Sequence, residues 1–87
     1  MTEDRLRVDV WLWRARFFRT RALAQEACEI GTVRCHGHRI DKGYALKLGD
    51  VLTFAQGPKL RTVRVAALGA RRGPPSEAAA LYEDLYP

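Results

Sequence analysis

The spacing of the hydrophobic residues changes at Gly31, and this change limits the folds open to the chain. Before Gly31, apolar residues recur at helical intervals, as on one face of a helix. After Gly31, apolar and polar residues alternate, as along a strand with one buried face. A chain that begins with helices and continues with short alternating segments is predicted to be an α+β protein.

The helical part is predicted to contain two helices joined by a very short link. Residues 7–18 form the first, and Thr20 is a plausible N-cap for a second over residues 21–30, which Gly31 would end. The predicted inner faces are Val8, Leu12 and Ala15 in the first helix and Leu23, Ala27 and Ile30 in the second. We expect Trp11 and Phe18 in the core, whereas Trp13 and Phe17, a second apolar stripe, could be core or could stack on bases.

The alternating part is predicted to be a set of short, mostly antiparallel strands. His36-Gly37 resembles a hairpin turn, because both residues tolerate a positive φ. The predicted strands are 32–35, 38–40, 51–54 and 60–68, with an irregular loop over 41–48, and a short C-terminal helix over 77–85 capped by Ser76. The 87 residues are expected to form one domain over 1–87, with a core at about 5–69 and an extension at 70–87.

Basic residues are concentrated in the body of the chain. Residues 5–72 hold all fifteen Lys and Arg but only half of the ten acidic residues. Such a field steers a protein toward a polyanion, and the excess of Arg over Lys favours phosphate, which Arg can bind with two hydrogen bonds. Nucleic acid is therefore the first candidate partner, although a basic surface also serves solubility alone. No apolar run is long enough for a bilayer and no signal peptide is apparent, so a cytoplasmic protein without a membrane partner is expected.

Catalytic and metal-binding patterns are absent from the sequence. It contains no Gly-rich phosphate loop, no nucleophile elbow and no HExxH motif, so we predict neither an enzyme nor a cofactor. Cys28 falls in an apolar helical pattern, where a buried free thiol is expected. Cys35 is followed by His36 and His38, but paired Cys-x-x-Cys spacing is missing, so no metal site is predicted.

The candidate binding residues cluster around the two helices and the first hairpin. Arg16 and Arg19 are three positions apart and could be neighbours on a helix, while Arg21 opens the second helix beside backbone N–H groups that suit a phosphate. Arg34 and Arg39 lie on opposite arms of the predicted hairpin and could extend the patch. Each arginine alone could equally be a solvated side chain, so the prediction concerns the cluster.

Several motifs occur in the order found in the S4 RNA-binding domain family, which the chain resembles. The family pattern R-L-D-x-W/F-L corresponds to residues 7–12, and its R-x-x-x-T-R-like segment to residues 16–21. The later matches are Gly31-Thr32-Val33, His36-Gly37 with His in place of the usual Asn, Lys42, and Gly49-Asp50. Within that family, Trp11-Leu12-Trp13 and the tail at 71–83 look like the stand-alone bacterial heat-shock protein 15 group.

The resemblance implies an αL-type fold, which is a helical hairpin packed on a small, mostly antiparallel sheet. It also implies a non-enzymatic RNA-binding function. The implied partner is ribosomal RNA of the large subunit, with a role in recycling stalled subunits that carry nascent chain on tRNA; contact with the tRNA itself stays open. Arg7, Arg16, Arg19, Thr20 and Arg21 would contact the RNA backbone, with Lys42 adding to the patch. The family members' long, charged C-terminal extension has no counterpart in this sequence, which ends at Pro87.

Two alternatives to a stand-alone RNA-binding monomer remain. S4 domains are also fused to pseudouridine synthases and tyrosyl-tRNA synthetases, so the chain could be a module that acts with a partner enzyme. A start at Met1 and the length of 87 residues lead us to expect a stand-alone protein instead. The second alternative is a protein-interaction module that uses Tyr82, Leu85 and Tyr86 as a docking edge.

Overall fold

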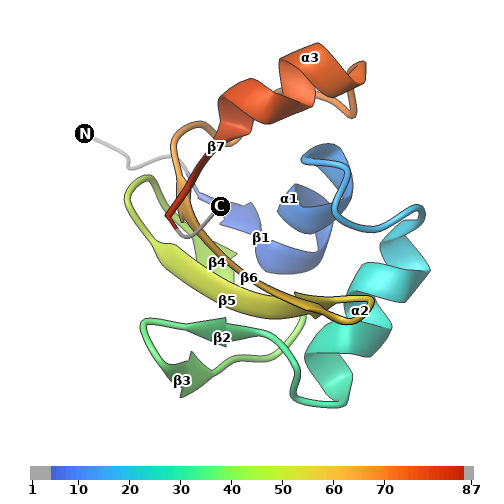
Figure 1. The fold of residues 1–87 in the computed structure, drawn as a ribbon, viewed down its shortest axis with the longest axis vertical. Coiled ribbons are helices and arrows are strands. Elements are labelled where there is room, and N and C mark those ends of the chain that lie inside the picture. The colour runs from blue at the N-terminus through green and yellow to red at the C-terminus, as the bar shows by residue number, and fades with distance from the viewer. Residues whose placement is uncertain (1–4, 86–87) are drawn as a thin grey trace.

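The computed structural model describes residues 5–85 and contains a helical layer packed on an antiparallel sheet (Figure 1). The helices are α1 (Val8–Arg14), α2 (Arg21–Glu29), α3 (Pro75–Ala78) and the single 3-10 turn η1 (Ala79–Leu81). The strands are β1 (Leu6–Arg7), β2 (Arg34–Cys35), β3 (His38–Arg39), β4 (Ala45–Leu46), β5 (Val51–Gln56), β6 (Lys59–Val65) and β7 (Tyr82–Asp84). This arrangement confirms the predicted α+β class with an antiparallel sheet.

The core lies between α1 and the long β5–β6 hairpin. Trp11, Leu12 and Phe54 are fully buried there, and the strand order β3-β2-β5-β6-β7 places β5 at the centre of the larger sheet. The Trp11 indole Nε1–H donates to the carbonyl oxygen of Ala67 at 2.9 Å, so the largest core side chain also satisfies its polar atom. Phe18 is partly buried against this cluster, in keeping with its predicted place in the core.

The first helix is shorter than predicted, because it ends at Arg14 rather than at residue 18. Arg16 has a φ of 64°, and the backbone N–H groups of Arg16 and Phe17 donate to the carbonyls of Trp13 and Leu12. These two bonds form a Schellman motif, which normally has glycine at the left-handed position. The predicted helical stripe of Trp13 and Phe17 is therefore wrong, as is the helical neighbourhood of Arg16 and Arg19.

The turn after α1 directs Phe17 into the core. Phe17 is 6% exposed, and its ring centroid lies 4.8 Å from that of Phe54 and 4.6 Å from that of Tyr82. Trp13 is only half-buried. The structure thus separates two aromatic residues that the sequence left together: Phe17 is a core residue, and Trp13 lies nearer the surface.

The second helix has the predicted position, and Ala27 is buried as predicted, but the other two predicted inner residues are exposed. Thr20 Oγ1 accepts a hydrogen bond from the Leu23 N–H at 3.1 Å, which confirms the N-cap, and Gly31 follows the helix with a φ of 83°. The buried residues are Ala24, Ala27 and Cys28. Leu23 and Ile30, predicted to face inward, are 44% and 65% exposed. These small side chains allow α2 to pack closely against α1, which it contacts.

The first hairpin and its surroundings follow the predicted alternation with shorter strands. His36 and Gly37 both have positive φ angles, 50° and 82°, which confirms the predicted turn between β2 and β3. Residues 41–48 are not wholly irregular, because β4 within them pairs with β1. Each of these two strands has only two residues, too short for a periodic signal in the sequence.

The C-terminal region differs most from its prediction. The helical part spans only α3 and η1, Pro74 rather than Ser76 is the N-cap, and no side chain caps the helix. Tyr82–Asp84, predicted to be helical, instead forms β7 on the free edge of β6. The open edge offers backbone hydrogen bonds that local propensity could not reveal. Within residues 5–85, no helix is both long enough and apolar enough to span a bilayer.

Candidate nucleic-acid interface

Two exposed arginines flank the N-cap residue of α2, at the end of the turn between the helices. Arg19 precedes the capping residue Thr20, and Arg21 begins α2. Among residues 5–85, neither guanidinium has an ion pair or a side-chain hydrogen bond. Thr20, also a predicted contact residue, uses its hydroxyl oxygen to cap α2. The turn therefore presents two unpaired guanidinium groups beside a helix N-terminus, an arrangement suited to phosphate.

Arg16 lies near the same turn but has a structural partner. Its Nε donates to the carbonyl oxygen of Gly73 at 2.6 Å, although the residue remains exposed. Arg14 donates to the carbonyl of Gly69 at 2.8 Å, and Arg72 donates back to the carbonyl of Trp13 at 3.1 Å. These three bonds hold the segment 69–73 against the end of α1.

The sequence analysis did not predict these arginine–carbonyl bonds between the end of α1 and the segment 69–73. Arg72 also lies over the Trp13 ring, with its Cζ 5.7 Å from the ring centroid. The distinctive tail beginning at Arg71 is the signal in the sequence for this contact, but it indicates a protein group and not a partner for Arg72. Arg14 is half-buried, and its bond to Gly69 gives it a structural role.

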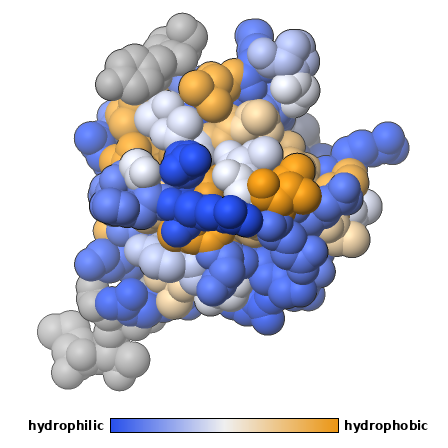
Figure 2. All heavy atoms as spheres, turned by 90° about the horizontal axis from the view of Figure 1, so that it is seen from below, coloured by the Kyte–Doolittle hydropathy of each residue, from blue (hydrophilic) through white to orange (hydrophobic). Residues whose placement is uncertain are grey.

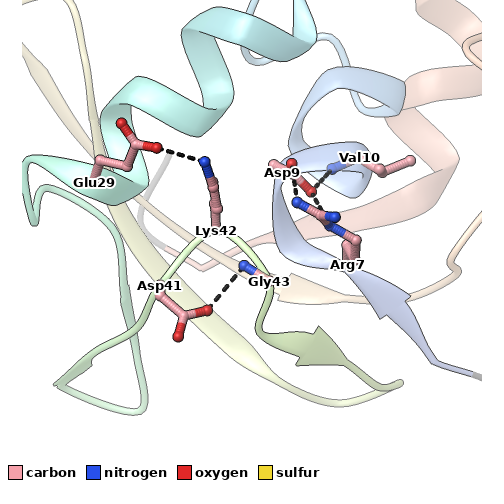
Figure 3. A network of polar contacts seen from close by, with 7 residues as sticks. All are labelled: Arg7, Asp9, Val10, Glu29, Asp41, Lys42 and Gly43. Carbon is pink, nitrogen blue, oxygen red and sulfur yellow. Dashed lines mark hydrogen bonds and ion pairs between the residues drawn. The ribbon is translucent and has the colours of Figure 1, made fainter.

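Arg7 and Lys42 lie at the other end of the helical hairpin (Figure 3). Arg7 donates from Nε and Nη2 to the carboxylate of Asp9 at 3.2 and 3.0 Å, and that carboxylate also accepts the Val10 N–H at 2.8 Å. Lys42 Nζ lies 2.7 Å from Glu29 Oε1, at the last residue of α2. Both cations are partly neutralised, so their net attraction for phosphate is weaker than that of the unpaired arginines at the turn.

Arg34 and Arg39 face each other across the β2–β3 pair. Arg39 Nη2 donates to the Glu29 carbonyl at 3.1 Å, and its guanidinium covers Gly31, where a Cβ would lie 2.8 Å from Arg39 Cζ. Gly31 is favoured as glycine by its φ of 83°, whereas the flexible Arg39 side chain above it could move aside for a Cβ. Arg34 is exposed and has no ion pair within the described part of the chain.

The predicted contact residues therefore fall into two groups and not one patch. The turn group contains Arg16, Arg19, Thr20 and Arg21, and the base group contains Arg7, Arg34, Arg39 and Lys42. The groups lie at opposite ends of α2, because residue 21 begins this helix and Glu29 ends it. Figure 2 views the molecule from below Figure 1, the side on which β3 and the C-terminal end of α2 lie. The surface on this side is mainly hydrophilic, with scattered hydrophobic residues.

The two cysteines are poorly suited to nucleophilic catalysis. Burial, followed by the charges of Asp9, Asp41 and Glu29, raises the pKa of the Cys28 thiol to about 11. Burial likewise raises the pKa of the Cys35 thiol. A thiol must lose its proton to act as a nucleophile, so both are expected to be inert near neutral pH.

Comparison with known proteins agrees with the features above. Residues 6–52 match the model of the S4 domain family. Heat shock protein 15 of Escherichia coli K12 is 48% identical over 79 residues, which cover 91% of this chain and 59% of the relative. The RQC P-site tRNA stabilizing factor of Halalkalibacterium halodurans is 37% identical over 60 residues, covering 69% of this chain and 68% of the relative.

A solved structure extends the likeness to the whole fold. The structure described as trimeric heat shock protein 15 of Vibrio cholerae superimposes with a TM-score of 0.89 at 33% identity, over 93% of this chain and 82% of that one. The chain spans 59% of the length of the Escherichia coli relative, so it matches only part of that protein. By its family match and its structural likeness, the chain belongs to the S4 domain family and is similar to heat shock protein 15.

Proposed function

We propose that this chain is a non-enzymatic RNA-binding protein that acts on ribosomal RNA of the large subunit. The observation that carries the proposal is the pair of exposed, unpaired arginines, Arg19 and Arg21, at the start of α2 in an S4-family chain. Phosphate contacts made by such groups recognise the shape of folded RNA and depend steeply on salt.

The contact residues have unequal roles in this proposal. Arg19 and Arg21 contact the RNA backbone directly, because no other described side chain competes for them. Arg16 and Thr20 mainly shape the turn, through Gly73 and the α2 cap. The base group, Arg7, Arg34, Arg39 and Lys42, forms a second contact with the same RNA and contributes less per residue, since three of its members already have partners.

The biological role proposed is the recycling of stalled large subunits that carry nascent chain on tRNA. One relative is named as a factor that stabilizes P-site tRNA, which supports a role near tRNA. A cytoplasmic location follows from this role. We treat residues 1–87 as one domain; the contacts of segment 69–73 with α1 and the pairing of β7 with β6 support this.

A monomer is the oligomeric state proposed, although the Vibrio cholerae relative is described as trimeric. Sedimentation equilibrium distinguishes the two states directly. The alternative docking edge at the C-terminus receives less support, because Tyr82 pairs in β7 and packs against the core. Tyr86 of that proposed edge lies outside the described residues.

The RNA-binding proposal is tested with a charge-matched pair of double variants. Arg19→Ala/Arg21→Ala removes the unpaired cations of the turn, whereas Lys59→Ala/Arg64→Ala removes the same charge from β6. The probes are purified Escherichia coli large subunits in a sucrose gradient and a helical fragment of large-subunit RNA titrated at several salt concentrations. We expect the turn variant to lose about tenfold or more in affinity and to lower the salt slope by roughly two.

The control variant should retain nearly full affinity at moderate salt. Equal losses in the two variants would mean that net charge alone drives binding and that the turn is no contact site. Undiminished binding of the turn variant, with circular dichroism confirming its fold, would overturn the assignment.

A further inference from the structure

Three potential metal ligands converge beside the first hairpin. The Sγ of Cys35, a ring nitrogen of His36 and a carboxylate oxygen of Asp50 all lie within 4.8 Å of one another. His36 Nε2 is 3.4 Å from Asp50 Oδ1. Cys35 and Asp50 are only 3% and 2% exposed, while His36 reaches solvent. The group therefore combines two buried ligands with one at the surface.

The fold brings these residues together in a way their spacing does not suggest. Consecutive residues of a strand point to opposite faces, but His36 leaves β2 with a φ of 50° and escapes that alternation. The pairing of β2 with β5 brings the start of β5 beside the hairpin. Cys35 is opposite Leu52, and the His36 N–H donates to the Val51 carbonyl at 2.9 Å. Asp50, immediately before β5, is thereby placed beside the hairpin turn.

The chemistry of the three groups suits a borderline-soft metal ion. Thiolate, imidazole and carboxylate are the ligands that zinc takes in proteins. We propose that Cys35, His36 and Asp50 bind a divalent transition-metal ion of the zinc class, with the fourth tetrahedral position open to solvent. The separation of 3.4 Å between Nε2 and Oδ1 matches the edge of a tetrahedron with metal–ligand distances of about 2.0–2.1 Å.

The surroundings of the site orient its ligands. The second oxygen of Asp50 accepts the Lys47 N–H at 3.1 Å, which fixes the carboxylate. The Tyr44 hydroxyl lies 3.8 Å from Cys35 Sγ. Cys35 binds as the thiolate, so one proton passes from its sulfur to solvent for each ion bound. An ion pair alone would explain why His36 and Asp50 lie close together. It would not explain why the Cys35 thiol also lies beside them, and this third group favours a metal site.

The test is a titration of the full chain, kept reduced, with Zn²⁺ and with Co²⁺ as a spectroscopic probe. We expect one ion per chain and, for Co²⁺, a thiolate-to-metal charge-transfer band together with the visible absorption of a tetrahedral ion. Cys35→Ser should abolish the charge-transfer band and weaken Zn²⁺ binding at least tenfold. His36→Asn should also weaken binding at least tenfold, and it should fold normally because Asn tolerates the positive φ of the turn.

Two matched variants serve as controls. Cys28→Ala removes the other buried thiol, and His38→Asn removes the histidine across the β2–β3 pair, which is outside the converging group. Both should bind one ion with nearly unchanged affinity and retain the charge-transfer band. The proposal is overturned if neither ion binds in the micromolar range, if Cys35→Ser keeps the band, or if either control loses as much affinity as the ligand variants.

Discussion

The Arg16 side chain donates from Nε to the carbonyl oxygen of Gly73 at 2.6 Å, joining the end of α1 to the segment that leads into α3. The same residue takes the left-handed position that ends α1, with a φ of 64°. One arginine thus ends a helix and anchors the C-terminal region. An alanine substitution here affects stability as well as surface charge, so it is a poor probe of RNA contact.

Substitutions of Arg16 should separate the hydrogen bond from the backbone strain. Arg16→Ala loses the bond to Gly73 and keeps a left-handed residue with a Cβ, so the free energy of unfolding should fall by about 1–2 kcal/mol. Arg16→Gly loses the same bond but relieves the strain, and should be about 1 kcal/mol more stable than Arg16→Ala. Urea denaturation measures both; a glycine variant no more stable than the alanine variant would contradict the account.

The N-cap of α2 should contribute measurably to stability. Thr20→Ala removes the acceptor for the Leu23 N–H and should cost about 1 kcal/mol in the free energy of unfolding. Thr20→Ser keeps the acceptor and should stay within a few tenths of a kcal/mol of the parent. Chemical denaturation followed by circular dichroism checks the pair. If the two variants are equally destabilised, the hydroxyl is not the capping group.

Trp11 should matter more to stability than Trp13. Trp11→Phe leaves the Ala67 carbonyl without its indole donor and leaves space in the fully buried core, so we expect a loss of about 2–3 kcal/mol. Trp13→Phe, at a half-buried position, should cost less than about 1 kcal/mol. Thermal and urea unfolding of both variants measure the two losses. A larger loss for Trp13→Phe than for Trp11→Phe would contradict the assignment of Trp11 to the core.

Stability should fall at alkaline pH partly because of Cys28. Burial raises the pKa of its thiol from 9.0 to about 11 in the folded chain. Below pH 9 both states keep the proton; between about pH 9 and 11 only the unfolded state loses it, so stability falls as pH rises through that window. The loss attributable to this group is about 2–3 kcal/mol.

The comparison variant for this effect is Cys28→Ala. Its unfolding free energy should fall less steeply over the same pH range, because it lacks the buried thiol. Urea midpoints measured at several pH values for both proteins give the two slopes. Identical slopes would show that the thiol is not protected by the fold.

Local signals in the sequence predicted the features that depend on neighbouring residues. Gly31 marked the end of α2, Thr20 its cap, and His36-Gly37 the hairpin turn, because each needs only the backbone preference of one or two residues. The predicted end of α1 was wrong because this local signal is missing there. Its left-handed residue is Arg16, whose type gives no hint of a positive φ.

Tertiary structure decided whatever depends on distant segments. The strand β7 exists because β6 offers it a free edge, and Leu23 and Ile30 are exposed because α1 packs on the small residues of α2. The sequence by itself determined the α+β class, the basic surface and the family resemblance, since these follow from periodicity, composition and short motifs. Only the tertiary structure decided which arginines are unpaired, because backbone carbonyls distant in the sequence, such as that of Gly73, bind some of them. The pairing of β2 with β5 likewise decided that Asp50, and not His38, lies beside Cys35 and His36.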